Sequence, residues 1–295
     1  MRRVEGAEIE LHTAIQGELG SNSHMAALEV LRARESGASE GNRRGQSLVV
    51  ACGAASEVFE KLEGGEVGMA VLPIENSLHG SVAEHLDLLL EHAAIVTGET
   101  LLRVRHNVIV PPGVRLAEVR QVMSHPVALS QCRGWLRAHP EIEAVPYYDT
   151  AGSVKRVIEG GLREVAGIAP ELAAEQYGGE VLVRGIEDHA ENYTRFYVLA
   201  ARRDGEQVEV AGANKMSVAF SVHHRPGSLM EALEGFRAAA LNLTKIESRP
   251  VPGKPWEYVF FVDLRFEALE QLEQGMGELR RHCQMVKELG RYRAA

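Results

Sequence analysis

Several absences narrow what this chain can be. It holds three cysteines, and Cys52, Cys132 and Cys283 lie too far apart in the sequence for a metal-ligand spacing. No apolar run is long enough to cross a bilayer, and no signal-like apolar core follows Met1. The formal net charge is -9 with no sustained basic run, which argues against a nucleic-acid partner. We therefore expect a cytoplasmic protein with reduced thiols that binds neither membrane nor nucleic acid.

What the chain does contain is the composition of a globular protein. Hydrophobic residues make up 45% and charged residues 25% of its 295 residues, enough for one large domain or two ordinary ones. After Ala201 the sequence turns polar, and this change predicts a linker over residues 202–214. We expect one region over residues 1–201 and a second domain over residues 215–295.

Apolar strands alternate with amphipathic helices over the first region, which predicts an α/β fold. The run Val67–Leu72 is almost continuously apolar, as in the inner strand of a sheet covered on both faces. A segment rich in glycine, serine and arginine predicts a surface loop over residues 35–46. The expected strands are Ile9–Ile15, Ser47–Ala51, Val67–Leu72, Val119–Met123, Val145–Tyr148, Val165–Ala169 and Tyr197–Ala201, with helices beginning near His24, Ala55, Ser81, Pro126, Thr150 and Pro170.

Polar or helix-starting residues follow four of these strands. The four junctions are Glu75–Ser77, Ser124–Pro126, Asp149–Thr150 and Pro170. In an open α/β sheet, ligands bind at this end of the strands, and helix N-termini attract anions such as carboxylates. Capping explains any single junction equally well, and Ser81 is expected to form a capping box with Glu84. Taken together, the junctions favour a binding cleft between two α/β lobes.

The stretch Gly185–Phe196 combines acidic residues, Asn192 and a threonine beside a cationic Arg195. An apolar strand follows at once, and a polar cluster against a buried strand is typical of a functional site. Arg195 would serve equally well in a structural ion pair with a nearby carboxylate of the same stretch, at Glu187, Asp188 or Glu191. The residues of this stretch leave both interpretations open.

The C-terminal part predicts a different architecture. Strands are expected over Met216–Val222, Asn242–Ser248, Tyr258–Leu264 and 285–289. One helix, with the apolar face Leu229, Leu233 and Phe236, follows the first strand, and a second helix is expected over Glu267–Arg281. This βαββαβ order is that of a ferredoxin-like domain. His223 and His224 are neighbours on an expected strand and would point to opposite faces, so they predict no metal site.

The chain resembles the prephenate dehydratases that carry a C-terminal ACT regulatory domain. The matching motifs occur in the family's order along nearly the whole chain, at Pro73–Ser77, Gly80–Val82, Ser124–Pro126, Asp149–Ala151, Asn192–Phe196 and Asn242–Pro250. The resemblance implies an α/β, two-lobed catalytic region like the type II periplasmic binding proteins, followed by a ferredoxin-like ACT domain. It also implies conversion of prephenate to phenylpyruvate in L-phenylalanine biosynthesis, without metal or cofactor, in a homodimer or homotetramer.

The resemblance also carries residue roles. The family's essential threonine falls on Thr194, which we expect to donate a hydrogen bond to the departing hydroxyl group, since a threonine is a poor acid but a good oriented donor. His125 is expected to be a polar wall residue or a helix cap rather than the acid. The expected substrate-binding residues are Ser23, Glu75, Asn76, Ser77, His125, Thr150, Asn192, Arg195 and Phe196. The expected effector residues, for L-phenylalanine bound between paired ACT domains, are Gly227, Ser228, Leu229, Asn242, Leu243, Glu247, Ser248 and Arg249.

Two departures from the family pattern bear on substrate choice. Asn22 stands where an aromatic residue is usual, and Val127 stands where a glutamine usually follows Ser-His-Pro. The sequence shows no helical chorismate mutase domain ahead of this region, so we expect a monofunctional enzyme. Two alternatives stay open at this point: an arogenate dehydratase, which performs the same elimination on the amino acid, and a non-catalytic amino-acid sensor.

Overall fold

The structure is a computed structural model that describes residues 12–37, 48–203, 210–251, 253–254 and 256–295. The chain divides into two compact units. The first unit combines Met1–Gly80 with Leu101–Phe196, and the second combines Ser81–Thr100 with Tyr197–Ala295. The sequence-based boundaries at residues 201 and 215 remain predictions.

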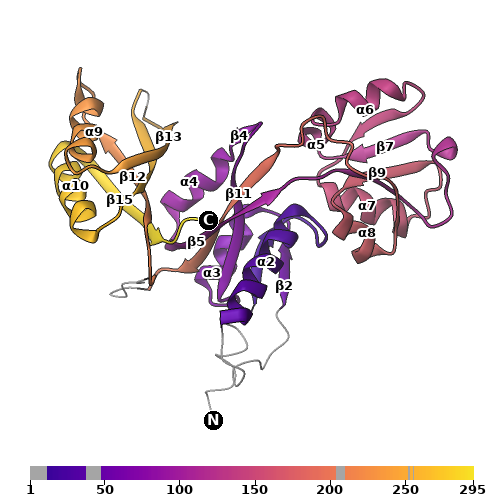
Figure 1. Cartoon of the computed structure of the whole chain (residues 1–295), viewed down its shortest axis with the longest axis horizontal. Coiled ribbons are helices and arrows are strands. Elements are labelled where there is room, and N and C mark those ends of the chain that lie inside the picture. Colours follow the sequence, from indigo (N-terminus) through magenta and orange to yellow (C-terminus); the bar gives the residue numbers. More distant parts are fainter. Residues whose placement is uncertain (1–11, 38–47, 204–209, 252, 255) are drawn as a thin grey trace, which may run out of the picture. The chain divides into compact units, whose positions relative to one another are not determined.

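The first sheet is built from β1 (Thr13–Gln16), β2 (Val49–Cys52), β3 (Met69–Asn76), β5 (Ala94–Arg103) and β11 (Tyr193–Ala201). Its strand order is β2-β1-β3-β11-β5, and the short β4 (Gly80–Ser81) pairs with β3 (Figure 1). β1 runs parallel to β2 and β3, as crossover helices between these strands require. The helices are α2 (Asn22–Gly37) and α3 (Ala55–Glu63), and residues 9–11 of the expected first strand lie outside the described residues.

The second sheet contains β6 (Asn107–Val110), β7 (Gln121–Ser124), β8 (Glu143–Pro146), β9 (Val165–Ala169) and β10 (Glu180–Val183), in the order β10-β6-β9-β7-β8. β7 is parallel to β8 and β9, whereas β6 is antiparallel to β9 and β10. The accompanying helices are η2 (Leu116–Glu118), α5 (Pro126–Ser130), α6 (Arg133–Ala138), α7 (Thr150–Glu159) and α8 (Glu171–Tyr177). The expected pair of α/β lobes is confirmed.

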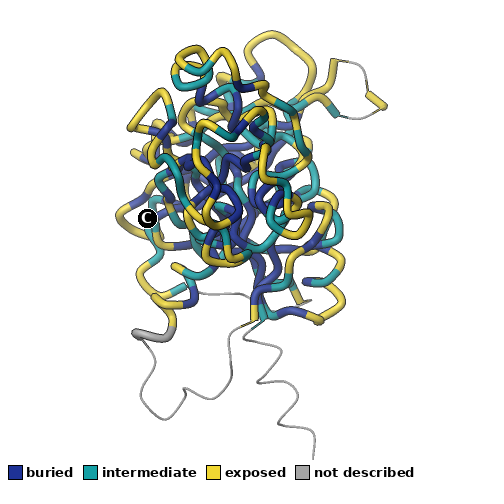
Figure 2. The backbone as a smooth tube through the Cα atoms, turned by 90° about the vertical axis from the view of Figure 1, so that its right-hand side faces the viewer, coloured by how far each residue is buried: buried dark blue, intermediate teal, exposed yellow. Residues whose placement is uncertain are grey.

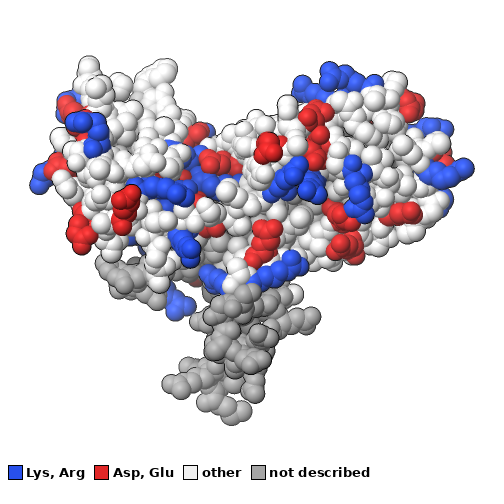
Figure 3. Space-filling view, viewed as in Figure 1, with Lys and Arg blue, Asp and Glu red and all other residues white. Residues whose placement is uncertain are grey.

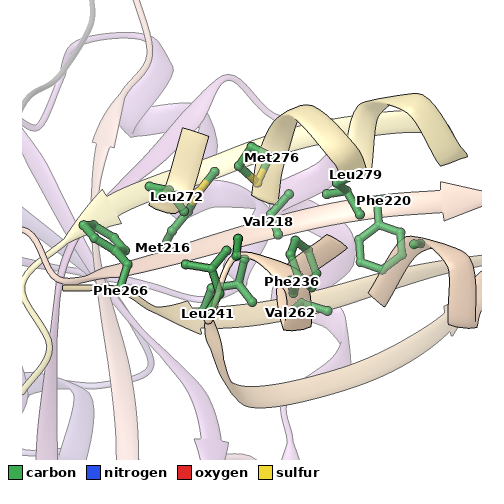
Figure 4. Close-up of a cluster of buried hydrophobic side chains, with 13 residues drawn as sticks. Met216, Val218, Phe220, Phe236, Leu241, Val262, Phe266, Leu272, Met276 and Leu279 are labelled. Carbon is green, nitrogen blue, oxygen red and sulfur yellow. The ribbon is translucent and has the colours of Figure 1, made fainter. Parts of the chain in front are cut away.

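The C-terminal sheet is antiparallel and four-stranded, in the order β13-β14-β12-β15. Its elements are β12 (Lys215–Val222), α9 (Ser228–Ala238), β13 (Asn242–Pro250), β14 (Tyr258–Arg265), α10 (Leu269–His282) and β15 (Cys283–Tyr292). Alternate residues of β12, Met216, Val218 and Phe220, are fully buried with Phe236 of α9 and Met276 of α10 (Figure 4). The expected βαββαβ order is confirmed.

A buried group of charged and hydroxyl side chains lies in the second unit. Lys215 lies 2.8 Å from a carboxylate oxygen of Glu99 and 3.7 Å from one of Asp263, and all three side chains are less than one-tenth exposed. The Ser217 hydroxyl donates to Asp263 at 2.6 Å, and the hydroxyls of Tyr197 and Tyr292 lie within 3.0 Å of Ser217. We call these six residues the charged cluster. It joins β5 and β11 to three strands of the C-terminal sheet.

The helix α4 (Ala83–Glu91) belongs to the second unit, and this helix and the preceding Ser81 form hydrogen bonds with β13. The expected capping box is wrong, because Val82 is the N-cap and makes no side-chain cap bond. Ser81 instead donates to the Glu247 carboxylate at 3.0 Å and accepts from Lys245 at 2.6 Å. Asp87 of α4 accepts two hydrogen bonds from the Arg249 guanidinium, at 3.1 and 2.7 Å.

Other differences from the sequence-based prediction lie in the first region. β5, β6 and β10 were not predicted, and β11 begins four residues earlier than expected, at Tyr193. The single helix expected after Ser124 is two helices, since α5 ends at Ser130 and α6 begins at Arg133. Asp188 causes the second start, because its carboxylate accepts from the backbone N–H groups of Arg133 and Gly134 at 3.0 and 2.7 Å.

The surface and interior agree with the composition. Buried residues, dark blue in Figure 2, lie in the interior and exposed residues at the turns. Acidic and basic side chains are interspersed over much of the face that Figure 3 draws. Cys52, Cys132 and Cys283 are all free, and burial raises the pKa of Cys52 to about 11. Among the described residues, no helix is both long and apolar enough to span a membrane.

Candidate functional site

The end of β3 meets the start of β11 in the first unit. The two strands are neighbours in the sheet, and the Ser77 backbone N–H donates to the Tyr193 carbonyl at 2.8 Å. The Ser77 hydroxyl accepts from the Tyr193 N–H at 3.0 Å. This register brings Asn76 and Ser77 next to Asn192 and Thr194, although more than a hundred residues separate the two motifs. The structure therefore unites the two central motifs of the sequence.

Asn76 has a defined orientation. Its side-chain oxygen accepts from the backbone N–H groups of Leu78 and His79, at 3.0 and 3.1 Å. A backbone N–H can only donate, so the acceptor end of the amide must point to this turn. The Asn76 amide nitrogen then donates to the Asn192 side-chain oxygen at 2.8 Å and to the Thr194 hydroxyl oxygen at 3.0 Å, with the Tyr193 carbonyl at 3.1 Å.

The hydrogen bond from Asn76 determines what the Thr194 hydroxyl can still do. Its oxygen receives a hydrogen bond from Asn76, so its own proton remains available to donate elsewhere. The residue is half-buried at the second position of β11, whereas Arg195 and Phe196 behind it are buried. A half-buried hydroxyl with a fixed acceptor side and a free proton is suited to donating to a bound molecule.

A buried side-chain amide extends this arrangement to the second lobe. Asn192 is fully buried and donates to the side-chain oxygen of Gln131 at 3.0 Å. The same oxygen lies 2.7 Å from Nε2 of His106, and the Gln131 amide nitrogen lies 3.0 Å from Nδ1 of His79. We call Asn76, Asn192 and Gln131 the amide network. It spans β3, the segment before β11 and the C-terminal end of α5.

Gln131, His79 and His106 are contacts that the sequence-based analysis missed. His79 lies between the two motifs Pro73–Ser77 and Gly80–Val82 and belongs to neither, and Gln131 carries no local signal because a glutamine near a helix end is usually solvated. His106 is almost fully buried, and burial lowers its pKa, although the hydrogen bond to Gln131 opposes that effect. Only the fold, which places α5 beside the ends of β3 and β11, shows that these three residues meet.

Glu75 and Arg195 form a second contact between the same strands. The Arg195 Nε donates to a Glu75 carboxylate oxygen at 2.7 Å, and the Arg195 side chain is almost fully buried. The expected alternative was an ion pair within the 187–191 stretch. Glu75 is an ion-pair partner of Arg195, while Glu187 accepts from the His106 backbone N–H at 2.9 Å and Asp188 caps α6.

The remaining expected substrate-binding residues have separate local roles. His125 is the N-cap of α5, where its Nδ1 accepts from the Val127 N–H at 3.2 Å. Thr150 is the first residue of α7, whose N-cap Asp149 accepts from the Gly152 N–H at 2.7 Å. Ser23 is buried in the first turn of α2, and Phe196 is fully buried in the core. Among the described residues, the side chain that forms a hydrogen bond with the Thr194 hydroxyl is Asn76, and these four residues lie elsewhere along the chain.

The loop between β1 and α2 packs closely against the second lobe. Gly20, at φ +87°, leaves no room for a side chain, since a Cβ there would lie 2.8 Å from the Ala173 backbone. The Glu18 carboxylate accepts from the Tyr148 hydroxyl at 2.7 Å and from Lys155 at 3.0 Å. These contacts bring the first turn of α2 toward the start of α7.

A pocket of about 520 Å³ lies in the second unit. Its lining comes from the end of β12, the loop into α9 and the start of β14, with Gly227, Ser228 and Leu229 beside Trp256 and Tyr258. The expected effector residues of β13 lie outside this lining; they are Asn242, Leu243, Glu247, Ser248 and Arg249. No group of three or more His, Cys, Asp or Glu side chains in the described part of the chain has the geometry of a metal site.

A model of the prephenate dehydratase family matches residues 13–204. Arogenate dehydratase/prephenate dehydratase 2 of Arabidopsis thaliana is 37% identical over 257 residues, which cover 82% of this chain and 66% of that protein. The chain spans just under two thirds of the length of curated relatives such as this one.

Two solved structures are similar over nearly the whole chain. One is a prephenate dehydratase from Arthrobacter aurescens in complex with L-Phe, with a TM-score of 0.82 and 29% identity, covering 96% of this chain and 90% of that one. The other is described as GqqA, a novel type of quorum quenching acylase, with a TM-score of 0.83 and 30% identity, covering 96% and 98% of the two chains. The expected fold class is therefore confirmed.

Proposed function

The chain belongs to the prephenate dehydratase family, and from this membership and the geometry around Thr194 we propose that it converts prephenate to phenylpyruvate. The observation that carries the proposal is the 3.0 Å contact between the Asn76 amide nitrogen and the Thr194 hydroxyl oxygen. It leaves the threonine with a proton to donate. The product serves L-phenylalanine biosynthesis in the cytoplasm.

The reaction needs little from the protein beyond position and one donor. The bond between the ring and its carboxylate breaks, and carbon dioxide leaves while the electron pair enters the ring. The carbon–oxygen bond to the opposite hydroxyl then breaks, the ring becomes aromatic, and the departing hydroxide takes up a proton to leave as water. Thr194 donates a hydrogen bond to that oxygen, and the bond strengthens as negative charge develops. Help of this kind is worth about a hundred- to ten-thousandfold in rate.

The two substrate carboxylates need separate holders. Ser77 lies beside Thr194 on the β3 side, and the first turns of α2 and α7 supply free N–H groups together with Ser23 and Thr150. Arg195 anchors one carboxylate or, through its pair with Glu75, stiffens the strand ends. Asn192 and Asn76 orient Thr194. His125 acts as a cap and wall, and Phe196 as support from the core.

For regulation, we propose that L-phenylalanine binds the pocket at the start of α9 and lowers activity. The Arthrobacter relative is described in complex with L-Phe. In a homodimer or homotetramer, β13 of a neighbouring copy would complete the site with Asn242, Leu243, Glu247, Ser248 and Arg249. Inhibition requires that the effector bind two states of the enzyme with different affinity. The contacts of Glu247 and Arg249 with Ser81 and Asp87 provide a route from β13 to the chain that follows Ser77.

Two other activities have a specific observation behind them. The Arabidopsis relative is named for arogenate as well as prephenate, and arogenate would undergo the same elimination. The structural similarity to GqqA makes acylase activity a further candidate. The Thr194 arrangement favours elimination over acyl transfer. Among the described residues, the hydrogen-bond partner of its oxygen is the Asn76 amide, whereas a nucleophile needs a histidine or carboxylate to activate it.

The test is a substrate panel. The purified chain is incubated separately with prephenate, arogenate and an N-acyl substrate, each with and without L-phenylalanine. Prephenate turnover suppressed by L-phenylalanine supports both proposals. Turnover of arogenate alone keeps the mechanism and changes the substrate, whereas acyl hydrolysis alone overturns the proposed reaction. Binding without turnover of any substrate would support the non-catalytic sensor.

A further inference from the structure

We propose that His79 is a positioning residue for this reaction: in its neutral form it holds the Gln131 side chain in the one orientation that supports Asn192 and, through Asn76, Thr194. The inference rests on the proposed function, since it concerns the same site. His79 lies in the turn between β3 and β4, and both ring nitrogens contact the second lobe. Nδ1 is 3.0 Å from the Gln131 amide nitrogen, and Nε2 is 3.1 Å from the Ser130 hydroxyl.

The backbone N–H groups of Leu78 and His79 fix the orientation of the Asn76 amide. This orientation sets the direction of each hydrogen bond from Asn76 through Asn192 and Gln131 to His79. Asn192 receives from Asn76 at its oxygen, so its nitrogen donates to the Gln131 oxygen. The Gln131 nitrogen must then donate to His79, which requires an unprotonated Nδ1 and places the ring proton on Nε2. Nε2 donates to Ser130, whose hydroxyl donates to the Val127 carbonyl at 2.7 Å.

A second proton on His79 would be incompatible with these hydrogen-bond directions. Both ring nitrogens would then donate, and Nδ1–H would face the Gln131 N–H groups. Relief comes if the Gln131 amide turns over, but its nitrogen would then face the donors of Asn192 and His106. Gln131 is 6% exposed and Asn192 is 0% exposed, so water cannot replace the lost partners. Protonation of one exposed ring therefore disturbs buried groups that orient Thr194.

The ionisable groups around His79 are otherwise engaged. His106 shares the Gln131 oxygen, and the carboxylate of Glu187 accepts from the His106 N–H. Asp188 caps α6, and Glu75 pairs with Arg195. His125, on α5, accepts from the Val127 N–H. Among the described residues, the side-chain hydrogen bonds of the His79 ring are those with Ser130 and Gln131.

The experiment compares variants of His79 across pH, with an enzyme-free blank at each pH. His79→Asn places an oxygen acceptor near the position of Nδ1 and cannot gain a proton, whereas His79→Leu removes the acceptor. Because the doubly protonated ring cannot accept from Gln131, wild-type turnover of prephenate should fall about tenfold per pH unit on the acid side. We expect His79→Asn to move this fall by at least about one pH unit to lower pH, and His79→Leu to be about ten- to thirtyfold slower at pH 8.

The matched control is His189→Asn, which removes another exposed histidine and should keep the wild-type profile. An unchanged acid limb in His79→Asn, or full turnover by His79→Leu at pH 8, would overturn the proposal. If His79→Leu does not fold, Ser130→Ala takes its place. It frees the ring to change tautomer and should slow turnover about two- to fivefold without altering binding of L-phenylalanine.

A readout without turnover separates this proposal from the proposed function. In histidine-labelled protein, the resonance lost in His79→Asn reports proton uptake by His79, and the resonance lost in His106→Gln identifies His106. Because the two rings share Gln131, the His106 resonance should shift at the pH where His79 titrates, and this shift should disappear in His79→Asn. A His106 signal insensitive to His79 would contradict the coupling even if the protein turned over no substrate.

Discussion

The amide network beside Thr194 and the charged cluster around Lys215 are both buried polar arrangements, and they differ in what they leave available. In the charged cluster, Lys215, Glu99 and Asp263 face one another at less than one-tenth exposure. The amide network is uncharged, and it ends in a half-buried hydroxyl whose proton has not been used. Buried polar groups that pair with one another stabilise the fold. A buried polar network that leaves one hydrogen-bond donor unused can act on a bound molecule.

The largest effect should come from breaking the charged cluster. Lys215→Met removes the buried cation that lies 2.8 Å from Glu99 and 3.7 Å from Asp263, so the free energy of unfolding of the second unit should fall by about 3–5 kcal/mol. Urea unfolding followed by circular dichroism measures this. Arg115→Met is the control, because Arg115 is exposed and pairs only at the surface with Glu118, where the loss should stay below about 1 kcal/mol. Equal losses in the two variants would contradict the comparison.

A substitution in the amide network should instead lower the rate of the reaction. Asn76→Asp keeps the shape but replaces a donor with an acceptor, so the Thr194 proton would turn toward the new carboxylate. We expect kcat for prephenate to fall about a hundredfold, with a smaller change in KM. Gln271→Glu adds the same charge in the capping position of α10 and should leave kcat unchanged. Turnover by Asn76→Asp within threefold of wild type would show that the direction of this hydrogen bond is unimportant.

Acid should destabilise the first unit, which contains both His24 and His106. Burial lowers the pKa of both His106 and His24, so below their ordinary value the unfolded chain binds more protons than the folded one. Stability is therefore full above about pH 6.5 and is lost as the pH falls, by about 1.4 kcal/mol per pH unit for each proton. Thermal unfolding at several pH values should show a shallower decline in His106→Gln. An identical decline would place the proton uptake elsewhere.

The smallest effect is expected at the link between α4 and β13. Asp87→Asn weakens a half-exposed pair with Arg249, and we expect L-phenylalanine to inhibit about two- to fivefold less strongly while uninhibited turnover stays the same. Inhibition curves for wild type and variant, with Glu118→Gln as a surface control, measure this. Unchanged inhibition would mean that β13 does not act through Asp87.

The sequence predicts much of this arrangement for physical reasons that are local. Asn76, Asn192 and Thr194 stand out because polar residues border apolar strands, and the βαββαβ order follows from periodicity. Gln131 could not be found this way, since its role depends on a strand pairing that joins segments more than a hundred residues apart. The break between α5 and α6 was missed for the same reason, because Asp188 caps the second helix from a distant segment. The Ser81 capping box failed because Lys245 and Glu247 engage that hydroxyl.

The most direct test of the central claim is the turnover of prephenate by Thr194→Ser and Thr194→Val. Serine keeps the hydroxyl that Asn76 orients, whereas valine keeps the shape and removes only the donor. We expect Thr194→Ser to retain kcat within about tenfold of wild type, and Thr194→Val to lose about a hundred- to ten-thousandfold in kcat at similar KM. Turnover by Thr194→Val close to that of wild type, or a loss confined to KM, would contradict the role of Thr194 as the donor to the departing hydroxyl.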